Sequence, residues 1–318
     1  MPAPTIENTF GALEIGSSIA VFLFGIVTLQ AFLYFTRFGK DHIQIKALVG
    51  TVWCLELGHT ISLAYEVYRT TISLYGRPEA ATKVPSFGAL TILGGLITML
   101  VQSFFSYRIW KLFPHPWRYL GMLCTTLAAI RGIMSVYAGI MGILSPSLVE
   151  YQVRFQTFIG AILLIGAGID LTIAVSMVYV LLEMPQMGVT RSRVTRIVDR
   201  GLAYTIRTGI VTSIGAISVV ALYHAMSGTL VYLAIYACIA KLYSNSLLST
   251  LNSRGNLDNM YSKATSVELP RQNRPNVLYP KPPPMLGGAA ANEMKKESGY
   301  KVDESKSSYQ VPLPTSSV

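Results

Sequence analysis

Seven long apolar runs divide the first 250 residues of the chain, and they leave little choice of architecture. They cover about residues 12–35, 46–68, 87–109, 119–143, 157–181, 203–224 and 228–250. A helix needs about 20 mostly apolar residues to cross roughly 30 Å of hydrocarbon, and each run is long enough. A β-barrel would need alternating apolar and polar residues, which these runs lack. The sequence therefore predicts an all-α polytopic membrane protein, a seven-transmembrane-helix bundle over residues 12–251.

The charge content agrees with a membrane location. Charged residues make up 13% of the chain, about half the share that is usual in soluble domains. That composition argues against a soluble enzyme. The net charge of +10 comes from bases that stand between the apolar runs and near the C-terminus, rather than on one folded face. We therefore expect the lipid bilayer, and no nucleic acid, as a partner.

The distribution of the bases predicts the orientation of the bundle. With the N-terminus outside, four bases fall in the outer loops, Arg69, Arg77, Lys83 and Arg154. Ten fall in the inner loops: Arg37, Lys40, Lys46, Arg108, Lys111, Arg118, Arg191, Arg193, Arg196 and Arg200. The positive-inside rule then predicts a short extracellular N-terminus over residues 1–11 and a cytoplasmic C-terminus. The last four of these bases form a cytoplasmic basic loop.

The two ends of the chain carry further expectations. The first ten residues hold no Lys or Arg, so they lack the basic start of a cleavable signal peptide, and we expect the first run to remain as a helix. Residues 252–318 are rich in Pro, Gly, Ser and Lys. This composition predicts a disordered cytoplasmic tail. Together with the inner loops, the tail is a candidate surface for a cytoplasmic signalling partner.

Ionisable residues inside the runs are costly in a bilayer, so they usually face the bundle interior. Four stand near the middle of their runs: Glu56, Arg131, Asp170 and Lys241. Their depths predict two contacts, Arg131 with Asp170 and Glu56 with Lys241. Two interpretations stay open, a ligand, ion or proton site and a pair of structural salt bridges. In the seventh run Asn245 lies one turn after Lys241, where it is predicted to hold helices together.

A polar side of the second run predicts a ligand site. Glu56, His59 and Glu66 fall on one side of that helix and climb from the middle toward its outer end. His224 stands at the outer end of the sixth run, where small residues, including Gly215 and Ser218, leave room. We therefore predict a small-molecule cavity in the outer half of the bundle, with these four titratable residues as candidate ligand-binding groups. The alternative is a dry bundle whose polar residues pair with one another.

Three more specific chemistries have weaker support. A retinal Schiff base on Lys241 would need an acid one turn earlier, as in microbial rhodopsins, and none is there. An intramembrane zinc hydrolase would need about three ligands, but His59 and His224 are the only histidines in or at the edge of the runs. The sequence motifs of rhodopsin-class receptors are absent, although the helix count and orientation agree. We predict no cofactor, no metal and no catalytic residue.

Several segments together resemble a known family. They are TFGALEIG at residues 9–16, WCLELGHTISLAYEVY at 53–68, VQSFFSYRIWKL at 101–112 and AIYACIAKLYSNSLLSTLNSR at 234–254. They resemble a membrane-protein family of basidiomycete fungi, catalogued as a domain of unknown function, number six-five-three-four. The named domain looks like the region of the fifth to seventh runs. The resemblance implies seven helices and a fungal membrane, and it brings no activity or ligand.

These observations favour a receptor-like seven-helix sensor of a small molecule. The span count, the orientation and the short outer loops support it, and we expect it in the plasma membrane. The alternative is a transporter or channel that uses the midplane charges, although no inverted repeat is evident. An enzyme is not expected, with an intramembrane hydrolase as the remaining enzymatic alternative.

Overall fold

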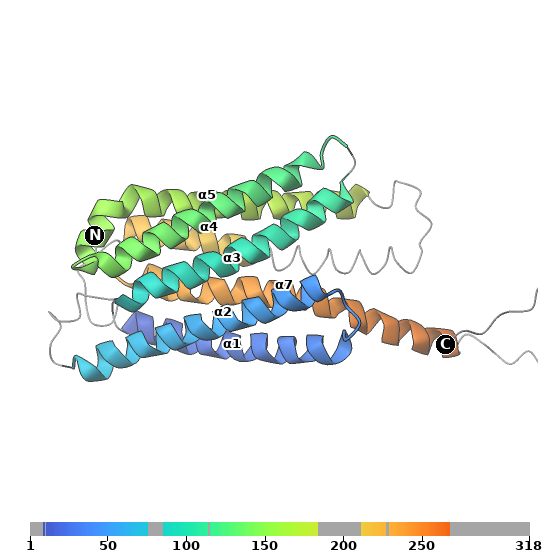
Figure 1. Ribbon diagram of the computed structural model, residues 1–318, viewed down its shortest axis with the longest axis horizontal. Coiled ribbons are helices and arrows are strands. Elements are labelled where there is room, and N and C mark those ends of the chain that lie inside the picture. The colour runs from blue at the N-terminus through green and yellow to red at the C-terminus, as the bar shows by residue number, and fades with distance from the viewer. Residues whose placement is uncertain are drawn as a thin grey trace, which may run out of the picture. The chain divides into compact units, whose positions relative to one another are not determined.

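The protein is an all-α bundle in a computed structural model that describes residues 9, 11–75, 85–113, 115–183, 211–226 and 229–267. Figure 1 shows its long helices lying alongside one another. They are α1 (Ala12–Arg37), α2 (Ile43–Tyr68), α3 (Pro85–Leu112), α4 (Tyr119–Leu144), α5 (Leu148–Glu183) and α7 (Val231–Val267). A short π-helical turn, η2 (Arg69–Ser73), extends α2, and a shorter apolar helix spans Val211–Ala225.

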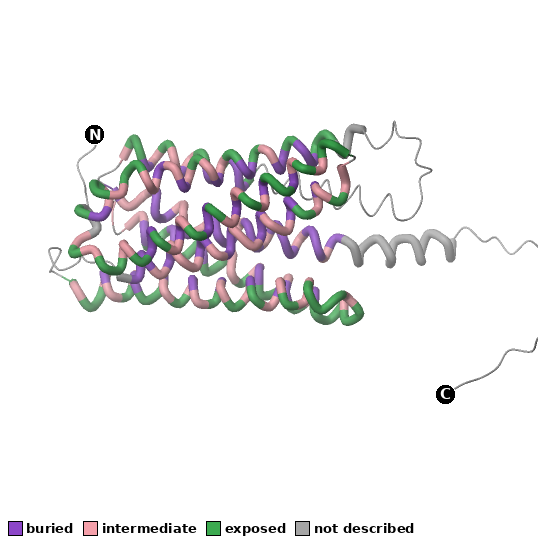
Figure 2. Tube along the Cα trace, turned by 45° about the horizontal axis from the view of Figure 1, so that its top comes forward, coloured by how far each residue is buried: buried purple, intermediate pink, exposed green. Residues whose placement is uncertain are grey.

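Six helices of the described chain are long and apolar enough to cross a membrane. Large hydrophobic side chains point outward from them, such as Phe22 and Ile133, each 70% exposed. Figure 2 shows the same division along the trace, with buried positions turned toward neighbouring helices and exposed ones turned away. Such a surface is stable only against lipid, because a soluble protein rarely leaves apolar patches of this extent in water. The chain is an integral, multi-pass membrane protein.

Helix α5 begins earlier than the predicted fifth run, at Leu148 rather than near residue 157. Its start carries a capping signal that a hydropathy reading does not register. The hydroxyl of Ser147 accepts a hydrogen bond of 3.2 Å from the backbone N–H of Glu150, which satisfies one of the free donors of the first turn. The sequence from Ser147 to Glu150 fits the Ser-x-x-Glu pattern of a capping box. The added turns bring Tyr151 into the bundle, where its side chain is buried.

The predicted boundary of the tail at residue 252 is wrong, because α7 continues as a helix to Val267. The compact unit that contains the bundle likewise extends to Glu268. Loss of apolar character ends a membrane span, but it does not end a helix. The rest of the predicted tail, residues 268–318, lies outside the described residues.

The predicted sixth run, 203–224, is described over its second part as the helix Val211–Ala225. Residues 203–210 lie outside the described residues, as do Arg191, Arg193, Arg196 and Arg200 of the predicted basic loop. At the turn toward α7, the backbone N–H of Met226 donates to the carbonyl of Leu222, 2.8 Å away. Gly215 lies against the side chain of Ile239 of α7. The sixth and seventh apolar segments therefore pack on each other.

Helix α7 packs against helices on both sides of the bundle. It packs against α1, α2 and α3, while α3 packs along α4 and α4 along α5. Glycines allow the closest contacts, as small residues do between membrane helices. At Gly16 of α1, a Cβ atom would stand 2.6 Å from the Cβ atom of Ala234 on α7. The close packing of α1 on α7 therefore depends on Gly16.

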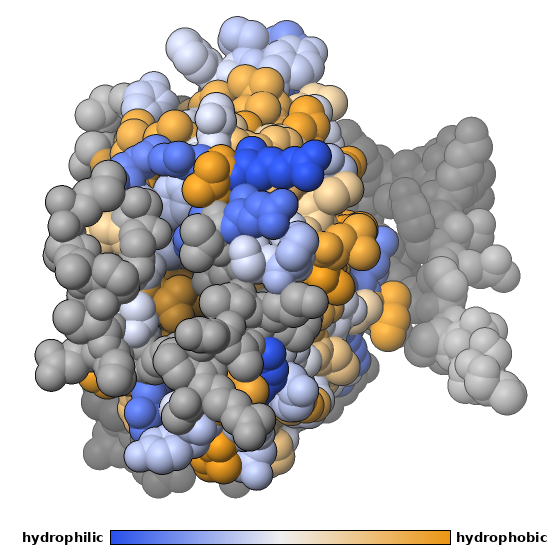
Figure 3. Space-filling model, turned by 90° about the vertical axis from the view of Figure 1, so that its left-hand side faces the viewer, coloured by the Kyte–Doolittle hydropathy of each residue, from blue (hydrophilic) through white to orange (hydrophobic). Residues whose placement is uncertain are grey.

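The odd-numbered helices α1, α3, α5 and α7 all begin at one end of the bundle, which Figure 3 views directly. Hydrophilic residues stand on the visible part of this face among hydrophobic ones. We refer to it as the entry end. The predicted orientation assigns it to the outside of the membrane, and that assignment stays a prediction.

Candidate ligand site in the helix bundle

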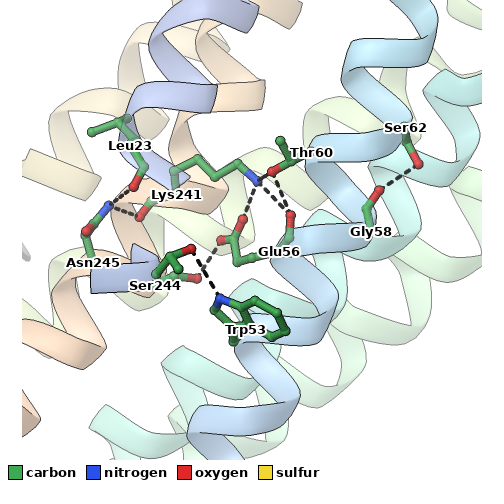
Figure 4. Close-up of polar contacts among 10 residues, drawn as sticks. Leu23, Trp53, Glu56, Gly58, Thr60, Ser62, Lys241, Ser244 and Asn245 are labelled. Carbon is green, nitrogen blue, oxygen red and sulfur yellow. Dashed lines mark hydrogen bonds and ion pairs between the residues drawn. The ribbon is translucent and has the colours of Figure 1, made fainter. Parts of the chain in front are cut away.

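The predicted contact between Glu56 and Lys241 is present, and it joins α2 to α7. The ammonium of Lys241 forms an ion pair with Oε2 of Glu56, and both side chains are completely buried. The same nitrogen donates to the backbone carbonyl of Glu56 at 3.2 Å and to Oγ1 of Thr60 at 2.8 Å. The hydroxyl of Ser244 donates to the other carboxylate oxygen of Glu56. Figure 4 shows the ammonium group enclosed by these oxygens.

This ion-pair cluster of Glu56, Thr60, Lys241 and Ser244 is chemically closed. All three hydrogens of the lysine are used, and both carboxylate oxygens accept a bond. A buried ion pair offsets its desolvation cost only when the remaining donors and acceptors are satisfied in this way. Asn245, one turn on, donates to the carbonyl of Leu23 on α1 at 3.3 Å, as expected for a residue that holds helices together. These contacts fit a structural junction of α1, α2 and α7.

The predicted direct contact between Arg131 and Asp170 is wrong in its form, because Gln102 of α3 stands between them. The amide nitrogen of Gln102 donates to Oδ1 of Asp170 at 2.9 Å. Its amide oxygen accepts from Nη1 of Arg131 at 3.3 Å. An amide carries both a donor and an acceptor, so it can link a carboxylate to a guanidinium. Tyr243 of α7 donates its hydroxyl to the second oxygen of Asp170.

Arg131 is 6% exposed, and its guanidinium also bonds to α5 and to a second residue of α3. Nε donates to the carbonyl of Ile162 on α5 at 3.1 Å, and Nη1 donates to Oγ1 of Thr98 on α3 at 2.9 Å. The group lies against Gly166, where a Cβ atom would come within 2.8 Å of its central carbon. Within the described part of the chain, Nη2 donates no hydrogen bond and Arg131 forms no ion pair.

The other predicted ligand residues do not form one site. His59 is completely buried, and neither ring nitrogen has a hydrogen-bond partner among the described residues. Glu66 is buried too, and it pairs with Arg69 at 3.1 Å. His224 is exposed, with Nε2 near Gly160 of α5. Because Glu56 is paired with Lys241, the polar residues of α2 lie in separate environments and do not share one site.

One cavity lies toward the entry end, where Phe87, Tyr151 and Tyr232 line it near the starts of α3, α5 and α7. Its walls come from α3, α4, α5, α7 and the helix Val211–Ala225, and its volume is about 40 Å³. The lining is mostly apolar, and three tyrosines contribute to it, Tyr151, Tyr232 and Tyr236. We call it the apolar cavity. None of the four residues predicted to bind a ligand lines it.

A second cavity adjoins it deeper in the bundle, and we call it the arginine cavity. It has a volume of about 20 Å³, and Thr98, Arg131 and Gly166 are among the residues that line it. Tyr236 and Leu163 line both cavities, so the two share a wall. Asp170 does not line the arginine cavity, and it faces a separate small cavity with Gln102. The charged group that meets the open space is therefore the guanidinium.

Sequence reasoning missed Thr98, Gln102 and Tyr236. A signal for the first two was present, because Thr98, Gln102 and Ser106 stand four residues apart on one face of α3, and all three are buried. A polar stripe inside an apolar helix marks a face that must find partners. For Tyr236 the sequence offers no comparable signal, since tyrosines are common throughout the chain and its role depends on which helices meet there.

Comparison with known proteins finds a similarity over part of the chain. A family model described as "Family of unknown function (DUF6534)" matches residues 166–256. No curated protein and no solved structure matches. The matched region holds Gly166 and Asp170 of α5, together with Tyr236, Lys241 and Tyr243 of α7. It thus supplies one side of both polar networks, and the remainder of the chain supplies the other. Residues 166–256 thus match the model of the family of unknown function that the closing segments resemble.

Proposed function

We propose that this protein is a receptor-like sensor of the plasma membrane, which binds a small molecule in the apolar cavity and responds on its cytoplasmic side. The observation that carries the proposal is the composition of the cavity walls. Five different helices contribute to them, and tyrosine rings stand among aliphatic side chains. Ligand sites of helix bundles have this character, with apolar walls and a few polar groups that fix orientation.

Because five helices line the apolar cavity, a ligand bound there affects how these helices are arranged. A molecule in the apolar cavity touches α3, α4 and α5 on one side and α7 on the other. Helix α7 in turn contacts α1 and α2. A ligand that prefers one arrangement of these helices shifts the population toward it. The cavity near the entry end is thereby coupled to the far ends of the helices, which the predicted orientation assigns to the cytoplasm.

The polar networks support a binding protein rather than an enzyme. In the ion-pair cluster, Glu56 and Lys241 satisfy each other and their neighbours. A catalytic acid or base must reach a substrate, and these groups are turned to one another instead. The same closure supports a sensor over a transporter, because moving a substrate past the pair would require separating two buried charges.

The proposal is tested by ligand-induced stabilisation of the purified protein in lipid nanodiscs. A panel of small organic compounds is screened by melting temperature, because a ligand at 100 times its Kd stabilises by about 2.7 kcal/mol. Ala138→Val narrows the apolar cavity, which Ala138 lines. Ala129→Val on the same helix is the matched control, since Ala129 lines none of the three cavities. We expect stabilisation in the wild type and the control, and its loss in Ala138→Val.

A second readout tests sensing itself. A fluorescent label on Trp117→Cys, in a background without the three native cysteines, reports on the connection between α3 and α4 at the far end. Trp117 is 67% exposed, so the label does not disturb packing. The compound that stabilises the protein should change the emission of the label. Stabilisation that is equal in Ala138→Val, or binding without a change in emission, would contradict the proposal.

A further inference from the structure

The connection between α3 and α4 gathers aromatic rings and bases at the point where two membrane spans end. It lies opposite the entry end, as does the connection between α1 and α2 (Figure 1). The rings of Tyr107, Trp117 and Tyr119 are exposed there. Tryptophan and tyrosine are enriched at the level of the lipid headgroups, because each combines an apolar ring with a polar N–H or O–H group. The position and composition of this connection therefore fit the headgroup region of a bilayer.

Two bases of this connection lie over aromatic rings. The guanidinium carbon of Arg118 is 4.6 Å from the centroid of the Trp110 ring, and the ammonium of Lys111 is 5.2 Å from the centroid of Tyr107. The two rings stack on each other, with their centroids 5.8 Å apart. Neither base forms an ion pair with any residue that the structure describes. We refer to these four residues as the aromatic–basic cluster.

Contact with a ring positions a base without satisfying its hydrogen-bond donors. The electron-rich face of the ring attracts the cation, and the N–H groups that point away from the ring still need acceptors. Lysine has three donors and arginine has five, and the planar fork of arginine matches two oxygens of one phosphate. The aromatic–basic cluster thus presents two positioned cations that have no acidic partner in the described part of the chain.

The charge around the cluster favours an anion without a positive group beside it. Phosphatidylcholine carries a positive choline next to its phosphate, and a surplus of bases repels the choline. An anionic phospholipid carries no such compensation, and bases at a membrane surface attract it. The two connections at this end, residues 37–46 and 108–119, contain one acid, Asp41, and the bases Arg37, Lys40, Lys46, Arg108, Lys111 and Arg118.

We infer that the aromatic–basic cluster binds the headgroup of an anionic phospholipid. Arg118 and Lys111 donate hydrogen bonds to its phosphate oxygens, and the exposed rings lie against the upper part of its acyl chains. The exposed rings favour a lipid over an acidic segment of a soluble protein, because a lipid covers the apolar rings as well as neutralising the bases. The site is separate from the apolar cavity, so the inference goes beyond the proposed function and does not depend on it.

The test is fluorescence quenching by brominated phospholipids in vesicles that contain the full-length protein. A Trp53→Phe background leaves Trp110 and Trp117 as the only tryptophans, so the signal reports on the lipid beside the cluster. In phosphatidylcholine vesicles, brominated phosphatidylserine should quench at a lower mole fraction than brominated phosphatidylcholine. Each base at a membrane surface changes the affinity for an anionic lipid about fivefold. Arg118→Gln and Lys111→Gln should therefore each reduce the preference for phosphatidylserine by about fivefold.

Lys40→Gln is the matched control, because it removes an exposed base from the same end, one that lies over no ring in the described residues. Exposed charges are screened over about 8 Å at physiological ionic strength, so this variant should retain the preference. An equal loss in Lys40→Gln and Arg118→Gln would overturn the inference, because the general charge of this end would then attract the lipid. Equal quenching by the two lipids in the Trp53→Phe background would also overturn it and would favour an acidic protein segment as the partner.

Discussion

The ammonium of Lys241 directs each of its hydrogens to an oxygen, and the carboxylate of Glu56 is satisfied just as fully. In hydrocarbon neither charge has water as an alternative partner. The pair therefore contributes less through attraction than through the penalty that follows when one member is missing. At the residue scale, the pair makes one arrangement of α2 and α7 much more stable than any other.

Replacing one member of the pair is expected to destabilise the bundle strongly. Lys241→Met leaves a buried carboxylate and should lower the free energy of unfolding by about 3–5 kcal/mol. The double variant Glu56→Gln with Lys241→Met should recover most of that loss, because no charge is then unpaired. Reversible unfolding in detergent micelles measures both.

A membrane-edge pair provides the control for this cycle. Arg69→Gln breaks the ion pair with Glu66 and leaves a carboxylate that is 1% exposed, so it should also destabilise the bundle. We expect a smaller loss than in Lys241→Met, because Arg69 is 19% exposed, whereas Lys241 is completely buried. A double variant as unstable as the sum of its single variants would show that Glu56 and Lys241 are not coupled.

Residue depth alone predicted one of the two charge contacts. Glu56 and Lys241 meet because α2 and α7 are neighbours and their side chains leave the helices at matching levels. Arg131 and Asp170 also match in depth, yet their direct contact failed because Gln102 of α3 fills the space between them. Depth can be counted along a sequence, whereas a third helix that intervenes depends on how the helices are arranged around one another. The predicted ligand residues on α2 stay a prediction, and none of them lines the three cavities described above.

At the scale of elements, close approach of helices depends on a few small residues. Gly16 of α1 meets Ala234 of α7 so closely that a Cβ atom would stand 2.8 Å from the backbone Cα atom of Ala234. Gly25, on the same helix, has nothing within 4 Å of its Cβ position. One glycine is thus required for packing, and the other is not.

These two glycines predict opposite outcomes for the same substitution. Gly16→Ala should lower the unfolding free energy by about 1–3 kcal/mol, since the contact is with backbone that cannot rotate away. Gly25→Ala should be neutral or slightly stabilising, because alanine favours the helix more than glycine does. Thermal unfolding in detergent distinguishes them. Recovery of stability in Gly16→Ala combined with Ala234→Gly would localise the effect to this contact, and no recovery would refute it.

At the scale of the whole molecule, the spans were largely predicted and their ends were not. Hydropathy located every long helix of the described chain, because a bilayer selects for about 20 apolar residues. The start of α5 at Leu148 is set by a serine cap, and α7 continues to Val267 through polar residues that a membrane span would not include. Hydropathy registers neither feature, so both boundaries were misplaced.

The predicted orientation is tested by labelling single cysteines in intact cells. Tyr75→Cys lies just after η2 at the entry end, and Trp117→Cys lies between α3 and α4 at the other end, and both parent side chains are exposed. In a background without Cys54, Cys124 and Cys238, a membrane-impermeant maleimide should label Tyr75→Cys at once. Trp117→Cys should be labelled only after permeabilisation, because the bases favour the cytoplasm on that side. The reverse pattern would invert the topology.

The pairing of α2 with α7 also has a consequence for how the chain is made. Lys241 follows Glu56 by 185 residues, and ribosomes add about 5–20 residues each second. Roughly 10–40 s therefore separate the synthesis of the acid from that of its lysine. During that interval α2 must be shielded by the insertion machinery or carry a protonated acid. Nascent chains arrested before Lys241 should accordingly be degraded faster than chains arrested after residue 267, so the last helix to be synthesised determines whether the earlier ones survive.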